Sequence, residues 1–276
     1  MQKKLFKISS QPVTDYFSGS YSNEHVIESI DIITGTKDMP WEKMLDAHVF
    51  SWFINTMHVN GVSTMMARLV RKYLDISYDQ FYAELFEYIQ SHPWLRKEQD
   101  EVREYYANWM REGRINHPNI GIEIHGWNLI HRSTINMHVE DTYDSVFDML
   151  ETFMHRFNLP QDLLQSAMKF QRNYVVQYKN RKNYPTEIKL DYNLWEYLTF
   201  DHELERKATS YLMVFPEDKD MSFPRFLELI YFARRRNFGK TMVECLDNEA
   251  HQLDMARRRE ASARATTTVT SGSMEA

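Results

Sequence analysis

Four side chains with binding or acid-base chemistry fall on or just after one strongly apolar stretch, residues 41–60. They are His48, Trp52, His58 and Arg68. On a helix of about 3.6 residues per turn, His48, Trp52 and Thr56 share one face, whereas His58 is rotated by roughly 80° from His48. Such residues could line a cleft that covers a cofactor. The apolar character of the helix favours the alternative, in which they pack in the core.

Two other pairs of ionisable residues have spacings that could support chemistry. Glu123 and His125 alternate in a stretch with the period of a strand, so both point to one face as an acid-base pair or, preferably, as a salt bridge. Glu151 and His155 stand four apart, a spacing typical of a surface contact on a helix. No nucleophile accompanies either pair, so the sequence assigns no catalytic residue.

Metal binding by this chain alone is not predicted. A di-metal helical bundle uses Glu and His three residues apart, and no histidine has Glu three positions before it. The single cysteine, Cys245, excludes an internal disulfide and any multi-cysteine zinc or iron-sulfur site built from this chain alone.

Neither of the two basic motifs near the end predicts a phosphate ligand. Gly239-Lys240-Thr241 resembles the end of a phosphate-binding loop, but the glycine required five residues earlier is Arg234, so a polar turn is favoured. Arg234, Arg235 and Arg236 would fan over about 200° of a helix and do not form one stripe. A net charge of −6 also disfavours nucleic acid as a partner.

The elements that must position these residues are mostly helical. Apolar residues make up 43% of the chain, and only 8 Gly and 8 Pro interrupt it, which favours long structured elements. Periodicity and capping residues predict helices over 41–60, 63–74, 77–92, 95–111, 141–157, 160–178 and 223–236. Strands are predicted over 26–33, 120–125, 187–192 and 208–215.

The fold class expected is therefore mainly α with a few short strands. We expect an extended lead-in over residues 1–25, one mainly helical domain over 26–256 and a disordered tail over 257–276, which is low in sequence complexity. No stretch approaches the roughly 20 apolar residues needed to cross a bilayer. We expect a soluble, cytoplasmic protein without a membrane partner.

Two short motifs carry a family resemblance. Thr36-Lys-Asp-Met-Pro-Trp41 and Ala47-His-Val-Phe-Ser-Trp52, together with the run from Phe226 to Gly239, resemble the helical carboxy-terminal region of cobalamin-binding (B12-binding) radical SAM enzymes. The resemblance covers about residues 20–255. It implies a helical capping domain that follows a barrel, in a family of methyltransferase-like or oxidoreductase-like enzymes.

The resemblance also implies cofactors that this chain does not hold by itself. The full assembly would use S-adenosylmethionine, a [4Fe-4S] cluster and cobalamin, but the chain has no Cys-x-x-x-Cys-x-x-Cys motif, barrel or cobalamin domain. Asp46-Ala-His48 is similar to the Asp-x-His-x-x-Gly cobalamin motif, yet position 51 is Ser and the triplet falls within a predicted helix.

We therefore expect an accessory or capping region that is inactive alone and needs a partner that carries the cluster. The alternative is a free-standing helical scaffold or interaction protein without catalysis.

Overall fold

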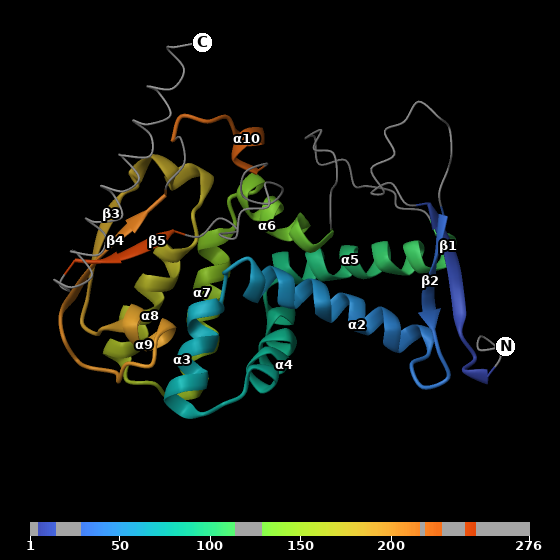
Figure 1. Cartoon of the computed structure of the whole chain (residues 1–276), viewed down its shortest axis with the longest axis horizontal. Coiled ribbons are helices and arrows are strands. Elements are labelled where there is room, and N and C mark those ends of the chain that lie inside the picture. The colour runs from blue at the N-terminus through green and yellow to red at the C-terminus, as the bar shows by residue number, and fades with distance from the viewer. Residues whose placement is uncertain (1–4, 15–28, 114–128, 216–218, 228–240, 247–276) are drawn as a thin grey trace, which may run out of the picture. The chain divides into compact units, whose positions relative to one another are not determined.

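The computed structural model describes residues 5–14, 29–113, 129–215, 219–227 and 241–246 (Figure 1). These residues are mainly helical and include two small antiparallel sheets, which confirms the expected fold class. They divide into two compact units. Unit 1 comprises Met1–Phe157 and Met221–Gly239, and unit 2 comprises Asn158–Asp220 and Lys240–Ala276. The range 26–256, over which one mainly helical domain is expected, has residues in both units.

Unit 1 begins with a two-stranded antiparallel sheet. Strand β1 (Ser9–Thr14) pairs with β2 (Ser29–Gly35), the strand predicted from its β-branched residues. Strand β1 lies within residues 1–25, which are expected to be an extended lead-in. No strand was predicted there, because a strand paired on one side needs no periodic apolar pattern. A tight turn follows β2, in which the Thr36 amide donates to the Met39 carbonyl at 2.7 Å.

The apolar stretch forms helix α2 (Trp41–Ile54) and continues without a break into a π-helical turn, η1 (Asn55–Val59). Pro40 directly precedes the helix, where its missing N–H costs nothing. The predicted helix is confirmed, but its last turn is wider than an α-helical one. Such π-helical turns recur at functional positions.

The next three helices were predicted, the first from the helical spacing of its apolar residues and the other two also from end signals. They are α3 (Thr64–Leu74), α4 (Tyr78–Tyr88), which ends in a 3₁₀ turn, η2 (Ile89–Ser91), and α5 (Pro93–Glu112). The Ser77 hydroxyl caps α4 by accepting the amide of Gln80 at 3.3 Å. Gly113 ends α5 with φ +67°, a conformation that favours glycine.

Helices α2 and α5 pack together in antiparallel directions, as Figure 1 shows. Near one end, the Arg111 guanidinium lies 4.9 Å from the centre of the Trp41 ring. Further along, Arg103 Nη2 lies 2.7 Å from Asp46 Oδ1. This pair of helices carries two of the four candidate residues.

Unit 1 is completed by helices α6 (Leu129–Val139), α7 (Tyr143–Met154) with the 3₁₀ turn η3 (His155–Phe157), and α10 (Phe223–Leu227). Helix α6 was not predicted. The core of the unit is rich in aromatic side chains, among them the fully buried Phe53, Phe81, Phe147, Phe153 and Phe226. Edge-to-face contacts, such as Phe81 with Phe153 at 5.5 Å, connect α4 with α7.

Unit 2 contains a three-stranded antiparallel sheet in the order β3-β4-β5. Its elements are α8 (Gln161–Tyr174), η4 (Tyr178–Asn183), β3 (Thr186–Leu190), α9 (Leu194–Thr199), β4 (Thr209–Val214) and β5 (Met242–Cys245). The ring of Phe170 on α8 packs edge-on against Tyr211 of β4 at 5.8 Å. Helix α8, β3 and β4 were predicted, with α8 ending earlier than expected, whereas β5 was not.

Some expectations lie outside the described residues. These are the strand over 120–125 with Glu123 and His125, the helix beyond Leu227 with Arg234, Arg235 and Arg236, and the tail over 257–276. Among the helices that the structure describes, none is both long and apolar enough to cross a membrane.

Candidate functional site

The structure places the four candidate residues in three different surroundings within unit 1. His48 lies on α2 and packs against α5. Its ring stacks on Tyr106 with 5.0 Å between centroids and meets the edge of Trp109 at 5.6 Å. Burial lowers the pKa of His48. These contacts are those of a half-buried histidine packed between two helices.

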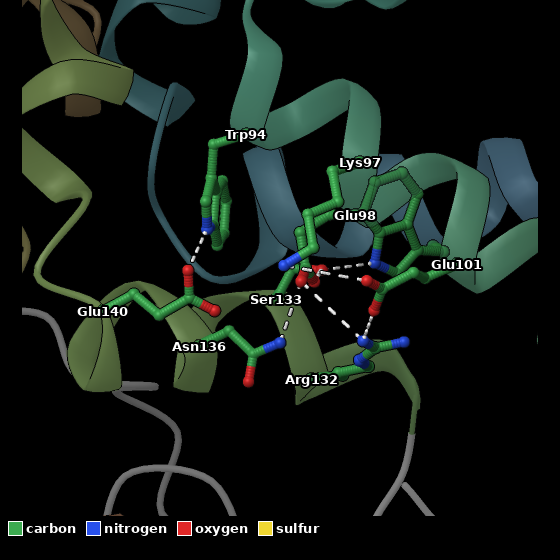
Figure 2. Close-up of polar contacts among 9 residues, drawn as sticks. Trp94, Lys97, Glu98, Glu101, Arg132, Ser133, Asn136 and Glu140 are labelled. Carbon is green, nitrogen blue, oxygen red and sulfur yellow. Dashed lines mark hydrogen bonds and ion pairs between the residues drawn. The ribbon is translucent and has the colours of Figure 1, made fainter.

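Trp52 belongs to a buried polar network that connects three helices. Its indole Nε1 donates to Ser133 Oγ of α6 at 3.0 Å, and that hydroxyl in turn donates to Glu98 Oε2 of α5 at 2.6 Å. The second oxygen, Glu98 Oε1, accepts the side-chain amide of Asn136 at 2.9 Å. Figure 2 shows Ser133 and Asn136 approaching the two oxygens of this carboxylate.

The cation nearest to this carboxylate is Arg132, also on α6. Its Nη2 atom lies 3.8 Å from Glu98 Oε1 and is hydrogen-bonded to Glu101 (Figure 2). Glu98 is only 1% exposed and Arg132 is 7% exposed, so the pair is withdrawn from water. Lys97 Nζ lies 3.8 Å from Glu101 Oε1, whereas Arg132 is hydrogen-bonded to Glu101 Oε2. Two cations therefore balance two carboxylates in this cluster.

His58 lies on the π-helical turn and contacts two tyrosines of α4. Its Nδ1 atom is 2.7 Å from the Tyr82 hydroxyl, and its ring meets the edge of Tyr78 at 5.8 Å. The Tyr82 hydroxyl is also 3.3 Å from Ser63 Oγ, which donates to the Met57 carbonyl at 3.0 Å. The result is a hydrogen-bonded chain from a half-buried imidazole through a buried phenol to the backbone.

Arg68 of α3 is half-buried and its charge acts on the same phenol. Burial raises the pKa of Tyr82 strongly, against smaller opposing effects of the Ser63 hydrogen bond and the Arg68 charge. Tyr82 therefore stays protonated at physiological pH. Of the four candidates, His58 and Arg68 both act on Tyr82. A tyrosine that keeps its proton is better suited to donate a hydrogen bond or relay a proton than to act as a nucleophile.

The other sequence motifs form no site in the described structure. Thr241 is buried, and its hydroxyl donates to backbone carbonyls of α8, while Gly239 and Lys240 lie outside the described residues. Glu151 and His155 fall at the end of α7 and in η3. Within the described ranges, no group of three His, Cys, Asp or Glu residues is placed to hold a metal ion.

A shallow surface hollow lies at the start of α5 and contains none of the four candidates. Its lining residues are Gln90, Ser91, Pro93, Arg96, Lys97, Asp100 and Glu101. The charges of both signs on its rim do not select one class of ligand.

Sequence reasoning missed the centre of the polar network. Glu98 is one of several acids on a helix whose exposed face is charged, and only burial distinguishes it. Ser133 and Asn136 lie on a helix with no apolar periodicity to reveal it. The one usable signal was the cluster of small polar residues, Ser133-Thr-Ile-Asn136, in a stretch that lacks Gly and Pro.

Comparison of the sequence with models of known protein families gives no match, and comparison with curated proteins gives none either.

Proposed function

We propose that this chain is a helical accessory region of a cobalamin-dependent radical SAM enzyme, in which it helps to enclose the reacting groups away from water. The [4Fe-4S] cluster would be held elsewhere in the assembly, either by a separate chain or by another part of the same polypeptide. Cobalamin and S-adenosylmethionine would be bound there as well.

The observation that carries the proposal is the structure of the segment with the family resemblance. Residues 36–52 form the turn after β2 and most of α2, and α2 buries Leu45, Val49, Trp52 and Phe53 in the core of unit 1. The two motifs with the family resemblance thus lie in segments that shape the fold of unit 1. This structural role suits an accessory region, since the resemblance assigns these residues no catalytic role.

The surroundings of His48 and Cys245 are also consistent with an accessory region whose cluster and cofactors are bound elsewhere in the assembly. His48 packs between aromatic rings, and Cys245 is a buried residue of β5 in unit 2. A cluster bound by three cysteines needs ligands from outside this chain.

The proposal is tested by isolating the protein anaerobically from its native cells through a tag on this chain. We expect iron and sulfide to accompany it, together with peptides that contain a Cys-x-x-x-Cys-x-x-Cys motif. The matched control is the chain produced alone, which should contain no iron. Isolation of a folded chain without iron and without such a motif would contradict the proposal.

That contradictory result would favour the free-standing scaffold. One observation suits this alternative: the exposed large apolar side chains of the described residues include ones that lie far apart in the sequence, such as Leu5, Tyr73 and Val139. A scaffold of this kind is expected to run as a stable monomer or homodimer in sedimentation experiments.

A further inference from the structure

Most of the buried residues described in helix α6, over 131–139, are polar. Ile135 and Met137 are the buried apolar residues of this range, whereas Arg132, Ser133, Thr134 and Asn136 are polar and at most 7% exposed. Burying a polar group is unfavourable unless it is hydrogen-bonded. Besides the apolar contacts of Ile135 and Met137, the attachment of α6 to unit 1 therefore depends on its polar contacts.

The hydrogen bonds around Glu98 point toward its carboxylate. The Trp52 indole N–H donates to Ser133 Oγ, and the Ser133 hydroxyl donates to Glu98 Oε2. The Asn136 amide donates to Glu98 Oε1. Both oxygens of the Glu98 carboxylate therefore act as acceptors in this network.

A second polar contact supports α6 from Asn60, the residue that follows the π-helical turn. The Asn60 side-chain amide donates to Thr134 Oγ1 at 3.2 Å, and the Thr134 hydroxyl donates to the His131 carbonyl at 2.9 Å. This contact involves neutral groups, whose hydrogen bonds are weaker than those to a charge. The charged contacts at Glu98 are therefore expected to dominate the attachment.

We propose that the ionised carboxylate of Glu98 is a lock that holds α6 in unit 1, and that loss of its charge releases α6 while α3 and α4 stay folded. The charged groups around the carboxylate are Arg132 from α6 and, on α5, Glu101 with its partner Lys97. Ser133 and Asn136 of α6 donate to the carboxylate directly, and Trp52 of α2 donates to Ser133. All three of these groups are neutral. Removing the negative charge leaves Arg132 buried with less compensation.

Selective release follows from how the rest of the unit is held together. Helices α3 and α4 are buried through apolar side chains, including Leu69, Val70, Phe81 and Leu85. Their attachment does not involve the Glu98 carboxylate. Loss of the lock therefore removes the main polar support of one helix and leaves the apolar core in place.

The test is amide hydrogen exchange of the full chain at one fixed pH, followed by mass spectrometry. In Glu98→Gln, the side-chain NH2 replaces one of the two acceptor oxygens. It then faces the donor group of either Ser133 or Asn136, and that hydrogen bond is lost. We expect exchange in peptides over 131–139 to become at least about tenfold faster, since hydrogen bonds to charged groups are among the strong ones. Peptides of α3 and α4 should exchange as in the wild type.

A double substitution provides the matched control. Asn136→Asp alone places two carboxylates face to face and should also speed exchange in α6. Glu98→Gln combined with Asn136→Asp exchanges the donor and acceptor roles and keeps the total charge, so protection of α6 should return.

Three results would overturn the proposal. The first is wild-type protection of α6 in Glu98→Gln, and the second is a double variant no better protected than either single one. The third is an equal loss of protection in α3 and α4, which would make Glu98 a support of the whole unit and not a lock on α6.

Discussion

At the scale of single residues, neighbouring positions on one helix serve different purposes. His48 and Trp52 are one turn apart on α2, yet His48 packs between aromatic rings whereas Trp52 donates into the network of Glu98. Helical spacing predicts that two residues share a face. It does not predict which partner each one meets, because the partners lie more than 50 positions away in the sequence.

The packing role of His48 leads to a prediction about cobalamin. His48→Ala should lower the free energy of unfolding by about 1–2 kcal/mol through loss of the ring contacts, and His48→Phe should lower it less. Chemical denaturation measures both. In titrations with hydroxocobalamin, the visible spectrum should be the same for wild type and variants. A spectral change that only the wild type gives would instead identify His48 as a cobalt ligand.

At the scale of elements, end signals and apolar periodicity predicted most helices. Ser77 caps α4 and Gly113 ends α5 as expected, because capping is a local interaction. Helix α6 and strand β1 were missed for physical reasons. The buried face of α6 is polar and hydrogen-bonded, and β1 is defined by its pairing with β2, so neither shows an apolar period.

Gly113 also determines how α5 meets strand β1. A Cβ atom at this position would lie 2.1 Å from the Pro12 carbonyl oxygen, and φ is +67°. Gly113→Ala should therefore lower the free energy of unfolding by about 2 kcal/mol or more, from backbone strain and the clash together. Thermal denaturation measures the loss, with Glu104→Ala on the exposed face of α5 as control. Equal stability of the two variants would show that β1 can move away from α5 at little cost.

At the scale of the whole molecule, unit 1 contains several histidines that burial keeps neutral. Burial lowers the pKa of His131 to about 4 and that of His138 to about 3. It also lowers the pKa of His92, whose Nδ1 accepts the Leu95 amide at 3.3 Å at the start of α5. Protonation of that nitrogen would remove the cap.

These shifts predict that unit 1 loses stability in mild acid. A folded-state pKa below the unfolded value of 6.5 means that the unfolded chain binds more protons as the pH falls. The free energy of unfolding should be constant above about pH 7.5 and decrease from about pH 6.5 toward pH 4. The slope for each such histidine is up to about 1.4 kcal/mol per pH unit. Urea denaturation at a series of pH values measures it, and a flat profile between pH 7 and 5 would contradict buried neutral histidines.

The central claim concerns the assembly to which the chain belongs, and reductive cleavage of S-adenosylmethionine tests it most directly. The protein isolated anaerobically through this chain is mixed with S-adenosylmethionine and dithionite, and 5′-deoxyadenosine is quantified. We predict that the isolated assembly forms 5′-deoxyadenosine and that the chain produced alone forms none. Failure of an assembly isolated in folded form to produce 5′-deoxyadenosine would contradict the account.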